Sequence, residues 1–199
     1  MSILDLLSDQ LSGEPTARIG QQLGVDEASA STAVSAALPV LMTALAGNAS
    51  RQGGVESLAG ALDRDHDGSI LDDLAGFLGN PDTANGDGIL RHTLGGQRGA
   101  VEQELGRQTG LDLGAVTKLL PILAPIVMGA LGRAKRQDSL DVGGLTSMLA
   151  GERQRAERGS SASLGAFAAL LDTNADGAVT DDVAKAGMNL LGKFLRRRR

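Results

Sequence analysis

The chain has 199 residues and a formal net charge of −5, with 42% hydrophobic residues, only 2% aromatic residues and no cysteine. This length is enough for one or two domains with a sizeable core. The absence of cysteine excludes disulfides, thiolate metal sites and cysteine nucleophiles, and the net negative charge disfavours general nucleic-acid binding, so we expect no nucleic-acid partner.

Helix-forming residues dominate the apolar segments. Runs such as VSAALPVLMTALAG show no alternation of apolar and polar residues, and a core without Trp or Tyr must be built from small aliphatic side chains. We therefore expect an all-α fold. The first residues, MSILDLLSDQLSG, carry Asp5 and Asp9 where a secretory signal would be apolar, so a cytoplasmic location is expected.

An internal repeat organises the chain. The segment that begins at Gln22, QLGVDEASASTAVSAALPVLMTALA, aligns without gaps with QTGLDLGAVTKLLPILAPIVMGALG, which begins at Gln108, at an offset of 86. In each copy the Gly is expected to end a short helix, the Asp to cap the next helix, and a proline to lie within that long helix. The pattern predicts an internally duplicated helical bundle.

An acidic loop follows the first copy of the repeat, at Asp63–Leu74 (DRDHDGSILDDL). Carboxylates on alternate residues repel one another unless a cation lies between them. A calcium loop of the EF-hand type takes oxygen ligands at positions one, three, five and seven, glycine at six and a carboxylate at twelve. The first four ligands would be Asp63, Asp65, Asp67 and Ser69.

A third acidic turn, Asn80–Leu90, has a different spacing and predicts a turn before a helix that starts near Ile89. His66 and His92 have no histidine or cysteine partner at metal-ligand spacing, so we expect them to face solvent or to have structural roles.

Candidate catalytic groups are scarce. Glu102 and Glu104 lie in an ordinary amphipathic helix without a partner for acid–base chemistry, and GGQRGA at Gly95 lacks the lysine of a phosphate loop and is expected to join two helices. We expect no enzyme.

The most apolar window is Leu119–Gly132, LLPILAPIVMGALG. Its fourteen residues are fewer than the ~20 needed to span a bilayer. A buried core helix is therefore preferred to a membrane-inserted hairpin. The polar run at residues 150–163 shows no apolar periodicity and predicts an exposed linker, which would divide a helical domain at residues 1–149 from a C-terminal helix-loop-helix at residues 164–199.

A second acidic loop, Asp172–Val183 (DTNADGAVTDDV), repeats the pattern of the first. Its corresponding ligands are Asp172, Asn174, Asp176 and, through the backbone carbonyl, Ala178.

Both acidic loops depart from the calcium pattern at position twelve, which is leucine or valine. If the exiting helix starts one residue early, Asp73 and Asp182 supply the last ligand; Asp72 and Asp181 are the alternatives. A single copy would suggest a turn in which Asp72 or Asp181 caps the next helix. The second copy favours Ca²⁺.

Four segments, LPVLMTALA, ILRHTLGG, GRQTGLD and LLPILAPIVMGALG, resemble the YidB-like bacterial proteins, a family defined by a domain of unknown function, over residues 4–151. The resemblance implies a compact helical fold and no particular reaction. Function is therefore left to the acidic loops.

The C-terminus, LLGKFLRRRR, places Lys193 and Arg196–Arg199 beyond an apolar stripe. These residues either complement the dipole of a helix end or contact an anionic membrane. The whole pattern predicts a calcium-binding helical protein, acting as a buffer, a sensor or a metal-stabilised scaffold. The alternative is a metal-independent structural or self-associating protein, and a monomer or small homo-oligomer is expected.

Overall fold

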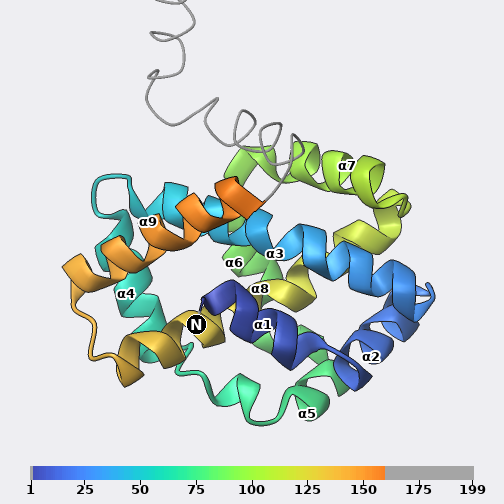
Figure 1. Cartoon of the computed structure of the whole chain (residues 1–199), viewed down its shortest axis with the longest axis horizontal. Helices are drawn as coiled ribbons and strands as arrows, with labels where there is room; N and C mark the ends of the chain where they lie inside the picture. Colours follow the sequence, from blue (N-terminus) through green and yellow to red (C-terminus); the bar gives the residue numbers. More distant parts are fainter. Residues whose placement is uncertain (1, 160–199) are drawn as a thin grey trace, which may run out of the picture.

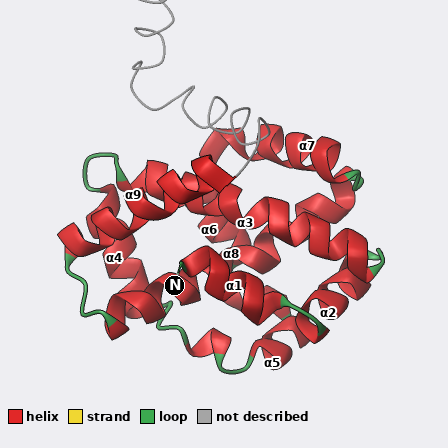
Figure 2. Ribbon diagram, in the orientation of Figure 1, coloured by secondary structure: helices red, strands yellow, loops and turns green. Residues whose placement is uncertain are grey.

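The computed structural model describes residues 2–159, and this part of the chain is all-helical (Figures 1 and 2). The predicted all-α class is confirmed. The α-helices are α1 (Ile3–Leu11), α2 (Glu14–Leu23), α3 (Glu27–Ala49), α4 (Gly54–Arg64), α5 (Leu74–Gly79), α6 (Gly86–Thr93), α7 (Arg98–Thr109), α8 (Leu113–Gln137) and α9 (Val142–Gly159). Short 3-10 helices are η1 (Ser69–Leu71), η2 (Pro81–Ala84) and η3 (Gly95–Gln97).

The two long helices α3 and α8 form the centre of the fold (Figure 1). They pack against each other, while α2, α4, α7 and α9 pack on α3, and α6, α7 and η1 pack on α8. Every residue from Ile122 to Gly132 is buried, as expected for a helix surrounded by other helices. The prediction that Leu119–Gly132 belongs to a buried core helix is confirmed, and that helix is longer than the apolar window.

Both central helices are long and apolar enough, by length and composition, to be candidate membrane spans within the described residues. However, 67% of the most apolar window of α3 and 72% of that of α8 are buried inside the fold. Burial of this extent accounts for their composition, because the core helices of a compact protein need the same apolar side chains.

The two copies of the repeat begin with the same local geometry. Gly24 and Gly110, which end α2 and α7, both have φ +74°. Asp26 and Asp112 then cap α3 and α8, each accepting a backbone N–H three residues ahead at 2.9 Å. These side-chain caps satisfy amides that have no partner within the helix, and the predicted helix ends are confirmed.

The structure differs from the predicted linker. Residues 150–159 are not an exposed connection but continue α9, in which Glu152 and Ala156 are buried. Helix α9 packs against α3 and α4, so it belongs to the same fold as α1 to α8. The second acidic loop, the C-terminal helices and the basic C-terminus lie outside the described residues.

Candidate functional site

The first acidic loop joins α4 to α5. α4 ends at Arg64, η1 covers Ser69–Leu71, and α5 begins at Leu74. Between them Gly68 has φ +90°, a conformation that glycine adopts without steric cost. The glycine at position six therefore makes a sharp turn, as the calcium-loop pattern requires.

Three carboxylates of this loop form ion pairs with the C-terminal end of α8. The basic residues there, Arg133, Lys135 and Arg136, are called the α8 basic cluster below. The pairs join Asp63 to Lys135, Asp67 to Arg136 and Asp72 to Arg133. The first pair has an N–O distance of 2.6 Å and the second 3.6 Å. The loop's negative charge is thus met, in part, by side chains of a single helix.

Hydrogen bonds to the backbone add to these pairs. The Arg133 guanidinium donates to the carbonyl of Gly68 at 2.8 Å. The Asp67 carboxylate accepts the Ser69 backbone N–H at 3.0 Å. Hydrogen bonds from Ser69 and the nearby charge of Arg136 lower the pKa of Asp67 below its ordinary value. The ionised form of Asp67 is therefore the one that the folded loop stabilises.

The predicted calcium ligands of this loop do not converge. Asp73 caps α5 by accepting the Gly76 N–H at 2.8 Å, the role that the capping alternative gave to Asp72. Within residues 2–159, no group of three or more His, Asp or Glu side chains lies close enough together to hold a metal ion. The loop as it stands does not fit a closed calcium cage. The ligands predicted in the second loop, Asp172, Asn174, Asp176, Ala178 and Asp182, lie outside the described residues.

The side chain of His66 is half-buried rather than fully exposed to solvent, and its backbone carbonyl lies against Gly132 of α8. Burial lowers its pKa, and the carboxylate of Asp65 opposes that shift without cancelling it. The unfolded chain therefore takes up a proton more readily than the folded chain as the pH falls through about 6.5.

We expect the free energy of unfolding to fall as the pH is lowered from about 7.5 to about 5.5, because protonation of His66 favours the unfolded state. His66→Gln should flatten this dependence, and Asp65→Asn should steepen it by removing the opposing charge. Urea unfolding at the two pH values measures both effects. Equal slopes for the wild type and both variants would contradict the assignment.

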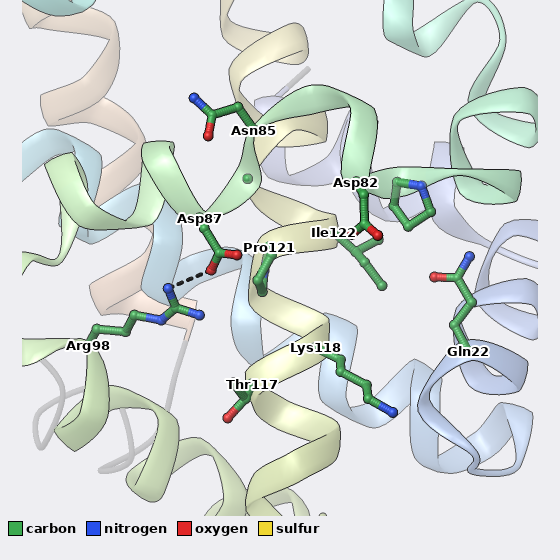
Figure 3. Close-up of a pocket in the computed structure, with 11 residues that line it drawn as sticks. Gln22, Asp82, Asn85, Asp87, Arg98, Thr117, Lys118, Pro121 and Ile122 are labelled. Carbon is green, nitrogen blue, oxygen red and sulfur yellow. Dashed lines mark hydrogen bonds and ion pairs between the residues drawn. The ribbon is translucent and has the colours of Figure 1, made fainter.

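A pocket of about 630 Å³, lined by both polar and apolar groups, lies on another face of α8, between α2, η2, α6 and the start of α7 (Figure 3). We call it the Pro121 pocket, because Pro121 lies at its centre in this view. Its charged and polar lining includes Gln22, Asp82, Asp87, Arg98, Thr117 and Lys118.

Arg98 is a charged residue of this pocket that forms two ion pairs. It pairs with Asp87 at 2.6 Å and with Glu102, also at 2.6 Å. Glu102 is only 8% exposed, so it is a buried, ion-paired residue rather than one on the exposed face of an amphipathic helix. The signal was present in the sequence as an Arg and a Glu four residues apart, the spacing that pairs side chains on one helix face.

Asp87 lies in the first turn of α6, which begins at Gly86, three residues before the predicted start. Asn85 takes a left-handed conformation, with φ +49°, and the helix begins directly after it. The predicted turn is therefore present but shorter, and it brings Asp87 within reach of Arg98.

A model for the family described as "bacterial protein of unknown function (DUF937)" matches residues 5–134. Its range covers α2 to α7 completely, together with the first acidic loop and most of α8. No curated protein and no solved structure matches the chain.

Proposed function

This chain belongs to the DUF937 family of bacterial proteins of unknown function, and we propose that it is a metal-independent helical scaffold, in which the first acidic loop holds α4 and α5 against the C-terminal end of α8. The observation that supports this proposal is the distribution of the loop's carboxylates over the α8 basic cluster. The proposal assigns no catalytic step.

The position of the basic cluster suits this role. Cations near the C-terminus of a helix are stabilised by the helix dipole, and the loop supplies them with counter-charges from another part of the chain. The Lys135 side chain is 14% exposed, whereas Asp63 is 56% exposed. Partly exposed pairs of this kind contribute at most about 1 kcal/mol each, so the loop is held by their sum and by the apolar contacts of η1 and α5.

We expect Asp63→Lys and Lys135→Asp to destabilise the fold by about 1 kcal/mol each, because each places like charges side by side. The double variant should recover about half of the summed loss or more. Urea denaturation of the four proteins measures this coupling. The exposed pair of Glu14 and Arg18 on α2 is the control, and its swap should couple by only about 0.3 kcal/mol. Additive single effects at Asp63 and Lys135 would contradict the proposal.

Calcium binding is the second candidate function. The carboxylates of Asp63, Asp67 and Asp72 are all more than half exposed, so an ion can reach them. Gly68 already has the left-handed turn that a calcium loop needs. Calcium binding at this loop would require its carboxylates to leave the α8 basic cluster. The second acidic loop carries the same sequence pattern and is the other predicted calcium site.

Calorimetric titration with calcium separates the two candidates. The calcium candidate predicts two ions per chain with dissociation constants of roughly 10⁻⁶ to 10⁻⁴ M, one site being lost in Asp67→Ala and the other in Asp176→Ala. The scaffold proposal predicts no saturable heat that depends on Asp67. A calcium site that is abolished by Asp67→Ala would overturn the scaffold proposal for the first loop.

We also infer that the two halves of the chain arose by duplication. The matched helix ends at Gly24 and Gly110, and the matched caps at Asp26 and Asp112, support this inference. The resemblance of the chain to the YidB-like proteins also stays a prediction.

The oligomeric state, the cellular location and the role of the basic C-terminus stay predictions. Self-association through Leu119–Gly132 would require this buried segment to leave the core, so we place any assembly surface elsewhere. We expect a monomer or small homo-oligomer, a cytoplasmic location, and at most a weak contact of Lys193 and Arg196–Arg199 with anionic lipid.

A further inference from the structure

The Pro121 pocket has a counterpart in the first half of the chain. A smaller pocket of about 220 Å³, the Ser31 pocket, lies against α3 and is lined by Ser12, Ser31 and Ser35 among others. These three residues precede Arg98, Thr117 and Pro121 by 86 positions, the offset of the repeat. At these matched positions the first copy has three serines, whereas the second has an arginine, a threonine and a proline.

The charged lining of the Pro121 pocket is balanced. Lys118 and Arg98 are cationic, and Asp82 and Asp87 are anionic. In the view of Figure 3, Arg98 and Asp87 lie on one side of Pro121, where they pair with each other, and Lys118 and Asp82 lie on the other side. No hydrogen bond or ion pair within residues 2–159 engages Lys118 or Asp82, so both are available to a ligand.

Pro121 removes one backbone donor from the helix that lines this pocket. Proline has no N–H, so residue 121 cannot donate to the carbonyl of Thr117 as an ordinary helical residue would. Thr117 lines the pocket beside Lys118. Within this lining, a ligand ammonium has the Asp82 carboxylate as an acceptor, and a ligand carboxylate has the Lys118 ammonium as a donor.

We propose that the Pro121 pocket binds a small zwitterion, of amino acid to dipeptide size, whose carboxylate pairs with Lys118 and whose ammonium pairs with Asp82. A net anion such as phosphate would be repelled by Asp82 and Asp87, and a polyamine by Lys118 and Arg98. The volume of about 630 Å³ lies in the range of small-molecule pockets. The proposal is independent of the role of the first acidic loop.

The test is a titration of the full chain with the dipeptide Ala-Ala, followed by amide shifts in NMR spectra. Its N-acetyl form is only anionic, and its C-terminal amide is only cationic. Each should bind at least about tenfold more weakly than Ala-Ala. Lys118→Ala should weaken Ala-Ala by about tenfold, whereas Thr32→Ala, the same position in the first copy, should not.

Asp82→Asn provides a second, independent readout, because it should weaken Ala-Ala without weakening the N-acetyl form, whose carboxylate no longer meets a repelling charge. Both substitutions are at exposed positions, and the dispersion of the amide spectrum shows whether each variant is folded. Equal binding of the three compounds, no effect of Lys118→Ala, or no saturable shifts up to ~20 mM would each overturn the proposal.

Discussion

Gly132→Ala should destabilise the fold by about 2 to 3 kcal/mol, although alanine is the better helix former. A Cβ atom at Gly132 would lie 1.8 Å from the backbone carbonyl oxygen of His66. Neither group can move aside as a flexible side chain would, because one is the buried core helix and the other is the backbone of the first acidic loop. The loop must therefore be displaced from α8, which also separates Asp63 and Asp67 from the α8 basic cluster.

The chain offers a matched control in the first copy of the repeat. Gly47 lies near the corresponding end of α3, and a Cβ there would meet nothing within 4 Å. Gly47→Ala should therefore stabilise the fold by about 0.5 kcal/mol, since only the helix propensity changes. Urea denaturation of both variants gives the two signs. A neutral or stabilising Gly132→Ala would show that the loop is not packed against α8 as described.

Local signals in the sequence predicted much of this fold. The caps at Asp26 and Asp112 and the helix ends at Gly24 and Gly110 depend on residues only a few positions apart. The close approach at Gly132 has no such signal, because it joins residues 66 positions apart in the sequence. It shows in sequence only as a departure between the copies, since Ala46 stands at the equivalent position of α3.

The partners of the acidic loop were missed for the same reason. The spacing of Asp63, Asp65 and Asp67 indicates that a cation is needed, but not whether it is a metal ion or a side chain from elsewhere. The structure brings in α8, and the Lys135 ammonium lies 2.6 Å from the Asp63 carboxylate. Sequence reasoning therefore identified the charged loop and its turn at Gly68, but not what lies against it.

The exposed linker that was predicted to start at residue 150 is wrong for a different reason. The buried positions of α9 include Leu145, Leu149, Glu152 and Ala156, which follow one another at intervals of four, three and four residues. This spacing is that of one helix face. Glu152 is one of these four residues and is charged. It therefore interrupts the apolar periodicity, and the sequence pattern did not predict that the helix continues past residue 149. A glutamate in a core position is rare unless it is paired, and here it is.

Glu152→Ala should destabilise the fold by about 2 to 3 kcal/mol. The side chain is 3% exposed, and its carboxylate accepts the hydroxyl of Ser2 at 2.7 Å and a guanidinium N–H of Arg155 at 2.7 Å. It also lies at the N-terminus of α1, where the backbone N–H of Leu4 is 3.4 Å away and the helix dipole favours a negative charge. Alanine would remove the acceptor and leave a void between α9 and α1.

Two further variants serve as controls. Glu152→Gln keeps an acceptor and should cost only about 1 kcal/mol. Gln154→Ala, at an exposed position of the same helix, should change stability by less than about 0.5 kcal/mol. Thermal and urea unfolding rank the three variants, and if Glu152→Ala were no more harmful than Gln154→Ala, then α9 would not be part of the fold that holds α1 in place.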